Sequence, residues 1–187
     1  MAYSMDPIQD GCYPGTAVLV NKFDIREEAK LNEVEAVLVS ARSAEWTNQP
    51  KANSFDFAHY KAVHCFLFSD LYDWAGQIRK VNISKKGTDF CPAADIVQQG
   101  KLVFDRLKQQ NYFKGLPHGS FVDEITDFYC ATNYLYPFRE GNGRTQRTFL
   151  AQLIRSAGYD INWSDMDGDL LMIATIQSAQ GVTDLLR

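Results

Sequence analysis

The sequence of 187 residues has few histidines and no cysteines spaced for metal or redox chemistry. Its three histidines are His59, His64 and His118, and they form no H-E-x-x-H pattern, which argues against a histidine-based metal enzyme. Its four cysteines include no C-x-x-C pair, so neither a zinc knuckle nor a redox pair is indicated. We therefore expect reduced thiols, as is usual in the cytoplasm.

Long apolar runs and an excess of basic charge are also missing. No stretch approaches the roughly 18 consecutive apolar residues of a membrane-spanning helix. Residues 1–14 lack the basic start and apolar run of a signal peptide. With 19 basic and 23 acidic residues, the chain gives no support for binding nucleic acid through bulk charge. We expect a cytoplasmic protein that needs neither a membrane nor nucleic acid.

The apolar residues that are present follow mostly helical spacing. We expect an irregular N-terminal arm over residues 1–23 and a single helical domain over residues 24–187. Asp24 and Ser54 are placed to cap the first two helices. Residues 81–91 instead alternate between apolar and polar around a turn, which predicts the one small hairpin. The predicted fold class is mainly α, a helical bundle with one β-hairpin.

The most informative segment lies between two predicted helices. Three residues form its turn: Gly141, Asn142 and Gly143. Such a turn can point successive N–H groups inward, and the next helix begins there with free N–H groups that favour an anion. Arg144 and Arg147 share a helix face, and Glu140 could hold a divalent cation. The pattern fits a Mg-polyphosphate site, but it also fits a plain tight turn with solvated arginines.

Residues 136–147 read Y-P-F-R-E-G-N-G-R-T-Q-R. This segment resembles the signature of Fic (filamentation induced by cyclic AMP) proteins, H-x-F-x-(D/E)-G-N-G-R-x-x-R, at every position except the leading His. Residues 64–79 resemble the family's helix before its flap, and residues 82–91 resemble the flap hairpin. The resemblance extends from about Tyr13 to Arg187.

The resemblance implies a helical bundle around two central helices joined by the signature loop. It also implies transfer of AMP from Mg-ATP to a hydroxyl side chain of a target protein (AMPylation), with release of pyrophosphate. Glu140 would hold Mg²⁺, and Phe138 would anchor the loop in the core. The residues that would bind the phosphates are Gly141, Asn142, Gly143, Arg144 and Arg147.

The flap is expected to bind the target by adding a segment of it as an extra strand. The residues that would contact the target are Ile83, Ser84, Lys85, Lys86, Gly87 and Thr88. The two lysines could attract acidic targets, or they could simply be solvated. The sequence does not indicate which protein is the target.

Tyr136 occupies the position of the histidine that acts as the family's general base. A phenol has a pKa of about 10, against about 6.5 for imidazole, so Tyr136 is expected to be a weak base. General-base assistance is worth about 10²–10⁴-fold, whereas positioning and charge stabilisation carry much of phosphoryl-type transfer. The alternatives are a weakened AMP transferase, a nucleotide- or target-binding relative without transfer, and a histidine deliberately replaced to silence the enzyme. A donor of UMP or phosphocholine is also open.

The inhibitory motif (S/T)-x-x-x-E-(G/N) that controls many Fic proteins does not occur in this sequence. The resemblance therefore implies a small antitoxin-like inhibitor in trans, as in bacterial toxin–antitoxin pairs, or an inhibitory C-terminal extension. Arg147 is the residue expected to pair with the inhibitor's glutamate.

Overall fold

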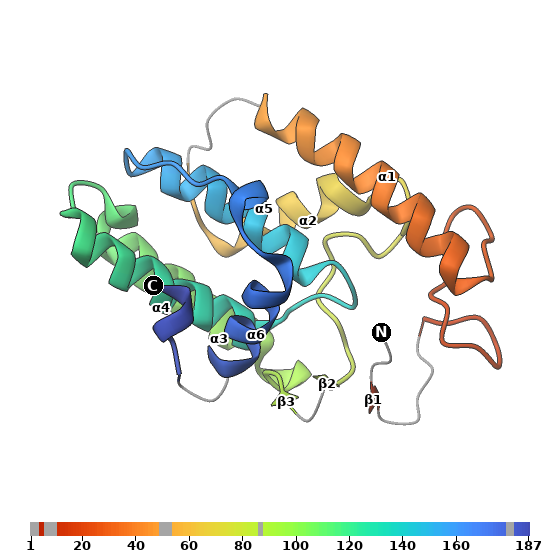
Figure 1. Cartoon of the computed structure of the whole chain (residues 1–187). Helices are drawn as coiled ribbons and strands as arrows, with labels where there is room; N and C mark the ends of the chain where they lie inside the picture. Colours follow the sequence, from red (N-terminus) through yellow and green to blue (C-terminus); the bar gives the residue numbers. More distant parts are fainter. Residues whose placement is uncertain (1–3, 6–10, 49–53, 86–87, 179–181) are drawn as a thin grey trace.

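A computed structural model of the chain describes residues 4–5, 11–48, 54–85, 88–178 and 182–187. In this part of the chain the predicted helical architecture is confirmed (Figure 1). The α-helices are α1 (Glu28–Thr47), α2 (Phe57–Phe68), α3 (Ile96–Gln109), α4 (His118–Leu135), α5 (Asn142–Ser156) and α6 (Gly168–Ser178). No helix in the described ranges is long and apolar enough to cross a membrane.

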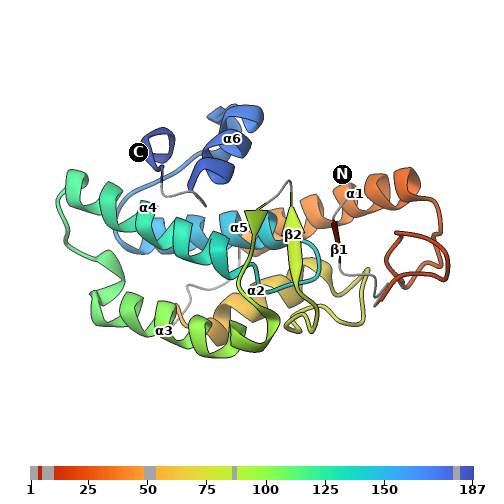
Figure 2. The same ribbon diagram turned by 90° about the horizontal axis from the view of Figure 1, so that it is seen from below.

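The predicted hairpin is present, and a third strand joins it. Strands β2 (Ile83–Lys85) and β3 (Thr88–Asp89) are antiparallel, with Ser84 opposite Asp89. Strand β1 (Ser4–Met5) pairs antiparallel with the other edge of β2, so the sheet order is β1-β2-β3. Figure 2 shows the three strands beside the ends of the central helices. The β1 pairing was not predicted, because a two-residue strand carries no periodic signal.

The first two helices begin later than the sequence predicts. Asp24 has a positive φ of 51° and caps nothing, because the Asn21 side chain organises this turn through the N–H groups that follow it. Helix α1 starts after Glu27 with no side-chain cap. Helix α2 is capped by Asp56, whose carboxylate accepts the N–H three residues on, and Ser54 donates to that carboxylate instead.

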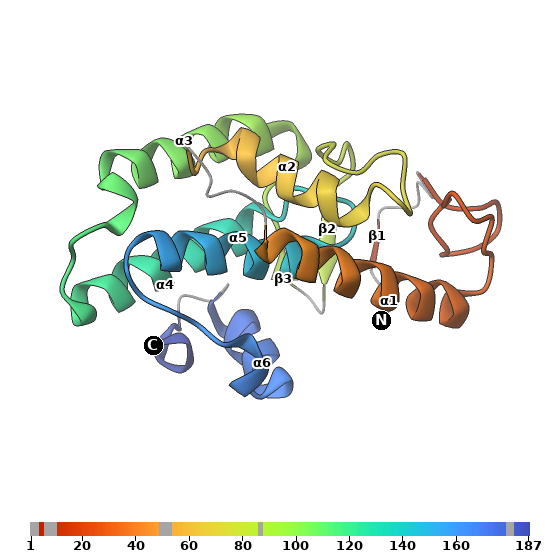
Figure 3. The same cartoon turned by 90° about the horizontal axis from the view of Figure 1, so that it is seen from above.

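The bundle is arranged around α4 and α5, which the signature loop connects. Helix α2 packs on α5, α3 packs on α4, and α1 lies across α2 (Figure 3). Helix α6 packs against α4 from the other side. The loop between α4 and α5 is thereby held at one end of the bundle, next to the strands.

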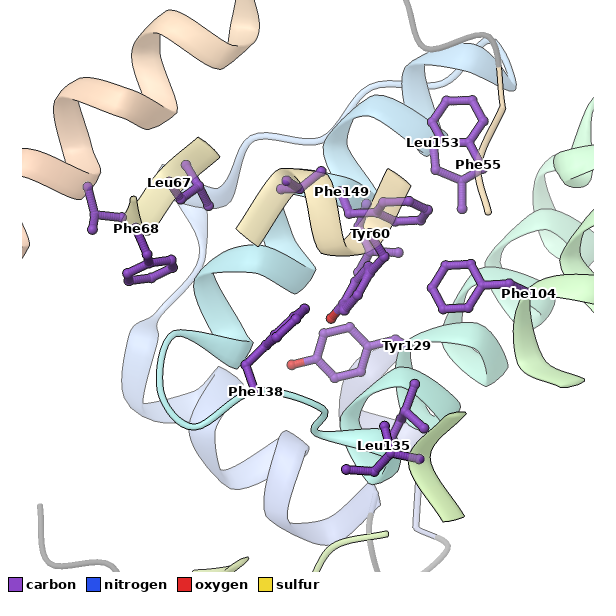
Figure 4. Close-up of a cluster of buried hydrophobic side chains, with 14 of the residues drawn as sticks. Phe55, Tyr60, Leu67, Phe68, Phe104, Tyr129, Leu135, Phe138, Phe149 and Leu153 are labelled. Carbon is purple, nitrogen blue, oxygen red and sulfur yellow. The ribbon is translucent and has the colours of Figure 1, made fainter. Parts of the chain in front are cut away.

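An aromatic cluster fills the space between these helices (Figure 4). Phe149 of α5 meets Tyr60 of α2 at 5.2 Å and Phe104 of α3 at 5.6 Å between ring centroids, both edge to face. Aromatic pairs in this geometry add about 0.5–1.5 kcal/mol each beyond the burial of their apolar area. The cluster therefore fixes the three helices that surround the loop.

The described part of the N-terminal arm also contributes to the core. Tyr13, Val18 and Leu19 are buried there, and the Tyr13 hydroxyl donates to the backbone carbonyl of Asn21. A boundary between arm and domain at residue 24 remains a prediction.

Candidate active site

The loop after α4 is anchored by the side chain of Phe138. Tyr136 ends the helix in the left-handed region, with φ at 37°. Phe138 then turns into the core, where it is fully buried and stacks on His64 at 3.8 Å between ring centroids. Burial of this ring confirms the expectation that it anchors the loop.

Asn142 closes the same loop on itself. Its side-chain oxygen accepts the N–H of Phe138, and its side-chain NH₂ donates to the carbonyl of Phe138, both at 2.8 Å. Both halves of the amide are therefore used inside the loop. What Asn142 can still offer a phosphate is its backbone N–H, rather than its side chain.

Gly141 occupies a position where no other residue fits. Its φ is 77°, and a Cβ built there would lie 2.2 Å from the ring of Phe68. Its carbonyl accepts both the N–H and the hydroxyl of Thr145, at 3.0 and 2.9 Å. The glycine brings the chain close to α2 and opens helix α5.

The start of α5 is suited to bind an anion. The first N–H groups of a helix, here those of Asn142, Gly143 and Arg144, have no carbonyl partner within it, and this end carries the positive end of the helix dipole. Arg147 lies one turn further on, and burial lowers the pKa of its guanidinium. No carboxylate of the described residues forms an ion pair with Arg147. A partly buried cation without a carboxylate partner favours binding of an anionic ligand.

Arg144 is held by carboxylates. Its Nη2 donates to Glu35 of α1 and lies 3.4 Å from the Glu140 carboxylate, while its guanidinium lies over the Phe68 ring. The buried Glu35 carboxylate also accepts the Tyr72 hydroxyl at 2.6 Å. Sequence reasoning missed Glu35, although its place between Leu31 and Val39 on the buried face of α1 is a signal.

The buried side chain of His64 supports the loop from helix α2. Its Nδ1 accepts the N–H of Gly76 at 2.8 Å, which leaves Nε2 to donate to the backbone carbonyl of Glu140 at 3.0 Å. Burial lowers the pKa of His64 to about 4, so the ring is neutral at pH 7. The prediction that His64 is packed is confirmed. The sequence did not predict its hydrogen bond to the backbone of Glu140, the predicted metal ligand.

We expect stability to fall between pH 6.5 and 4 because of His64. The unfolded imidazole takes up its proton near pH 6.5, whereas the buried ring resists protonation until about pH 4. The unfolded state therefore binds more protons in this window, and the free energy of unfolding decreases as the pH falls, by on the order of 3 kcal/mol in total. Urea unfolding at a series of pH values, without added metal, measures this decrease.

The matched variants are His64→Gln and His118→Gln, the latter at an exposed histidine. His64→Gln should be less stable at pH 7 but should lose less stability on acidification. His118→Gln should follow the wild-type curve. Equal pH dependence in wild type and His64→Gln would contradict this role.

Arg79 joins the hairpin to the loop. Its backbone N–H donates to Pro137, and its guanidinium donates to the backbone carbonyls of Tyr136, Val81 and Cys91. The side chain is almost wholly buried, and burial lowers its pKa. One arginine thus ties both legs of the hairpin to the segment that precedes Phe138.

Among the predicted flap residues, Ile83 is buried and faces the core. Ser84, Lys85 and Thr88 contribute backbone to strands β2 and β3. The remaining two, Lys86 and Gly87, lie outside the described residues.

A comparison with protein families decides what this loop is. Residues 54–154 match the model of the Fic/DOC family, and they contain the loop, the start of α5 and the hairpin. The chain belongs to the Fic/DOC family. This confirms the family that the signature predicts, and the solved structure described next confirms the helical fold.

Three proteins illustrate the similarity. Protein adenylyltransferase VbhT of Bartonella schoenbuchensis is 36% identical over 98% of this chain, which spans only 38% of that relative. The probable protein adenylyltransferase Fic of Escherichia coli is 32% identical over 90% of this chain and 84% of its own length. The crystal structure of BepC from Bartonella tribocorum with bound AMPPNP has a TM-score of 0.90 at 28% identity, and it covers 95% of this chain and 92% of its own.

Tyr136 stands at the first position of the Fic signature, and its ring lies on the flap. It stacks on Phe90 at 3.9 Å between centroids, with 12° between the ring planes. Tyr136 therefore lies against the hairpin of β2 and β3, at the position where the signature has its histidine.

Glu140 is the predicted Mg²⁺ ligand of the Fic loop. No group of three or more His, Cys, Asp or Glu side chains in the described ranges is arranged to hold a metal ion. Mg²⁺ is commonly held by one or two carboxylates together with the phosphates of a substrate. The Glu140 carboxylate beside the start of α5 is therefore compatible with a Mg²⁺ ion that binds together with a nucleotide.

Proposed function

We propose that this Fic protein transfers AMP from ATP to a hydroxyl side chain of a target protein, and that Tyr136 makes the transfer slow. The observation that carries the proposal is the start of α5, where N–H groups without a partner in the helix lie beside a partly buried Arg147 that forms no ion pair with a carboxylate of the described residues. The family match and the adenylyltransferase names of the relatives support the same activity.

Residues of the loop and of the first turns of α5 share this mechanism. The N–H groups at the start of α5 bind phosphate oxygens, and Arg144 and Arg147 bind the β- and γ-phosphates. Glu140 would hold Mg²⁺, which when bound would supply further neutralisation of the phosphate charge. The target oxygen forms a bond to the α-phosphorus while the bond from that phosphorus to the bridging oxygen breaks, and the electron pair leaves with pyrophosphate. The hydroxyl proton goes to water, because Tyr136 as a phenol is a poor acceptor at neutral pH.

The target is proposed to bind along the flap by strand addition, as in other sheet-edge recognition. The candidate site for the target strand is the edge of β2 that faces away from β3. Strand β1 already pairs with this edge through Ser4 and Met5. A target strand at this edge has to displace β1. The residues proposed to meet the target are still those of the predicted flap.

We expect removal of residues 1–6 to increase target labelling. If displacement of β1 costs about 1 kcal/mol of backbone pairing, the increase is about fivefold. The measurement compares labelling rates with and without residues 1–6 in a Tyr136→His background. ATP affinity should stay the same in both proteins. An unchanged labelling rate would show that β1 does not compete with the target.

A small inhibitory partner is also part of the proposal. Arg147 forms no ion pair within the described part of the chain, so it is suited to receive a glutamate from another protein, as in a toxin–antitoxin pair. The named relatives come from bacteria, and ATP is a cytoplasmic donor, so we propose a bacterial cytoplasmic setting. Affinity purification from the source cell should recover the partner with wild type and lose it with Arg147→Ala.

The experiment that tests the activity uses ATP labelled at the α-phosphate or the γ-phosphate. We expect slow labelling of protein in a cell lysate from the α-labelled nucleotide and none from the γ-labelled one. Labelling from the γ-position alone would contradict AMP transfer. Parallel reactions with α-labelled UTP and with a labelled phosphocholine donor test the alternative groups.

A second candidate is a Fic protein that binds nucleotide or target without transfer. Tyr136 itself favours it, because the ring stacked on Phe90 replaces the base of the signature. ATP binding by calorimetry with no label in any lysate protein would support this candidate over the first.

A further inference from the structure

Helix α1 contributes a carboxylate to the phosphate end of the site. Glu35 is 6% exposed and lies on the face of α1 that packs into the bundle. It is 109 residues from Arg144 in sequence, yet its Oε1 accepts a hydrogen bond from Arg144 Nη2. A buried carboxylate is costly unless its hydrogen bonds are satisfied, so this pair holds a fixed geometry.

The second oxygen of Glu35 is fixed as well. Glu35 Oε2 accepts the Tyr72 hydroxyl at 2.6 Å, and burial together with the Glu35 charge raises the pKa of that phenol well above its usual range. Tyr72 is thus always a donor. Its ring stacks on Trp74 at 4.4 Å between centroids, which holds the hydroxyl in place. Glu35 therefore cannot turn away from Arg144 without losing a second bond.

The consequence for Arg144 is a defined orientation. Nη2 is taken by Glu35 and approached by Glu140, whose carboxylate oxygen is 3.4 Å away, and the guanidinium lies over the Phe68 ring at 4.9 Å. Nε and Nη1 donate to no acceptor among the described residues. The Nε and Nη1 nitrogens of the guanidinium therefore remain to donate to an anion.

We propose that Glu35 is a positioning residue that orients Arg144 toward the β- and γ-phosphates and keeps it from pairing fully with Glu140. This inference rests on the proposed nucleotide site. Glu35 contacts neither nucleotide nor metal; it acts through Arg144. By accepting the closer hydrogen bond from Nη2, it limits the movement of Arg144 toward Glu140, and Tyr72 fixes Glu35 in turn.

A positioning role for Glu35 and simple Coulomb attraction predict opposite changes in ATP affinity. Glu35→Gln removes a negative charge near the phosphates, which by Coulomb attraction alone would strengthen ATP binding. If Glu35 orients Arg144, the variant instead binds ATP about tenfold more weakly. The amide has one acceptor oxygen for the two donors, Arg144 and Tyr72, so one hydrogen bond is lost and Arg144 turns to Glu140. AMP, which lacks the β- and γ-phosphates, should bind with unchanged affinity.

Calorimetric titration with Mg-ATP and with AMP measures these affinities. Glu45→Gln is the matched control, since it makes the same charge change on the same helix at an exposed carboxylate paired with Arg42. Tyr72→Phe serves as a second variant, because it loosens Glu35 without changing any charge. It should weaken ATP binding by about threefold and leave AMP binding unchanged.

The outcomes separate the inference from the proposed function. Weaker ATP binding in Glu35→Gln or Tyr72→Phe, with AMP binding and Glu45→Gln unaffected, supports the positioning role. Equal or tighter ATP binding in a folded Glu35→Gln overturns it. If Glu35→Gln does not fold, wild-type ATP affinity in Tyr72→Phe overturns it. Absence of ATP binding in wild type would instead contradict the proposed function itself.

Discussion

Tyr136→His should increase the rate of AMP transfer by about 10²–10⁴-fold, the usual contribution of a positioned general base. An imidazole has a pKa of about 6.5, so a large part of it can accept the proton of the target hydroxyl at pH 7. The backbone can accept the change, because histidine is among the residues that tolerate a positive φ such as the 37° at this position. Initial rates of labelling from α-labelled ATP measure the effect.

Tyr136→Phe is the matched control for this experiment. It keeps an aromatic ring to stack on Phe90 but has no group that can accept a proton. If the phenol of wild type gives no base assistance, Tyr136→Phe and wild type should label at the same slow rate. A Tyr136→His protein that binds ATP but labels no faster than wild type would show that the missing base is not what limits transfer.

Gly141→Ala should abolish nucleotide binding and lower the stability of the fold. The new Cβ would lie 2.2 Å from the ring of Phe68, and φ at 77° is strained for alanine. Overpacking of a core and a left-handed backbone each cost about 1–3 kcal/mol. Since the same movement displaces the first N–H groups of α5, we expect ATP affinity to fall by at least about a hundredfold.

Gly158→Ala separates strain from crowding. Gly158 also has a positive φ, 94°, but nothing lies within 4 Å of a Cβ built there. This variant should be destabilised only by the strain of alanine at a positive φ, and it should keep its ATP affinity. Urea unfolding and calorimetry on both variants give the comparison. Wild-type ATP affinity in Gly141→Ala would contradict the assigned role of the loop.

The sequence could predict what depends on local pattern. The helical spacing of apolar residues predicted the bundle, and the alternation over residues 81–91 predicted the hairpin. The Gly-Asn-Gly turn between two helices predicted where α5 starts, and binding of an anion there stays a prediction. These features depend on residues close together in the sequence, so each can be recognised from a local sequence pattern.

The remaining features depend on contacts between distant segments. Glu35 meets Arg144, and His64 meets the carbonyl of Glu140, through packing of α1 and α2 on the loop. No periodicity links such positions. The first helix caps were wrong for a related reason, since the Asn21 side chain competed with Asp24 for the turn.

Contacts in the structure also define the roles of single loop residues more closely than the sequence does. The resemblance assigned Asn142 to the phosphates, whereas its amide is used to close the loop on Phe138. Arg79, which joins flap and loop, has no marker in the sequence beyond its place before the hairpin.

The central claim is that the loop before α5 is an intact nucleotide site although its general base has been replaced. Calorimetric titration of the wild-type protein with Mg-AMPPNP tests this most directly, because the analogue binds without any transfer. We predict saturable binding of one nucleotide per chain, lost in Arg147→Ala. No binding up to about 1 mM nucleotide, by a protein that unfolds cooperatively, would contradict the account.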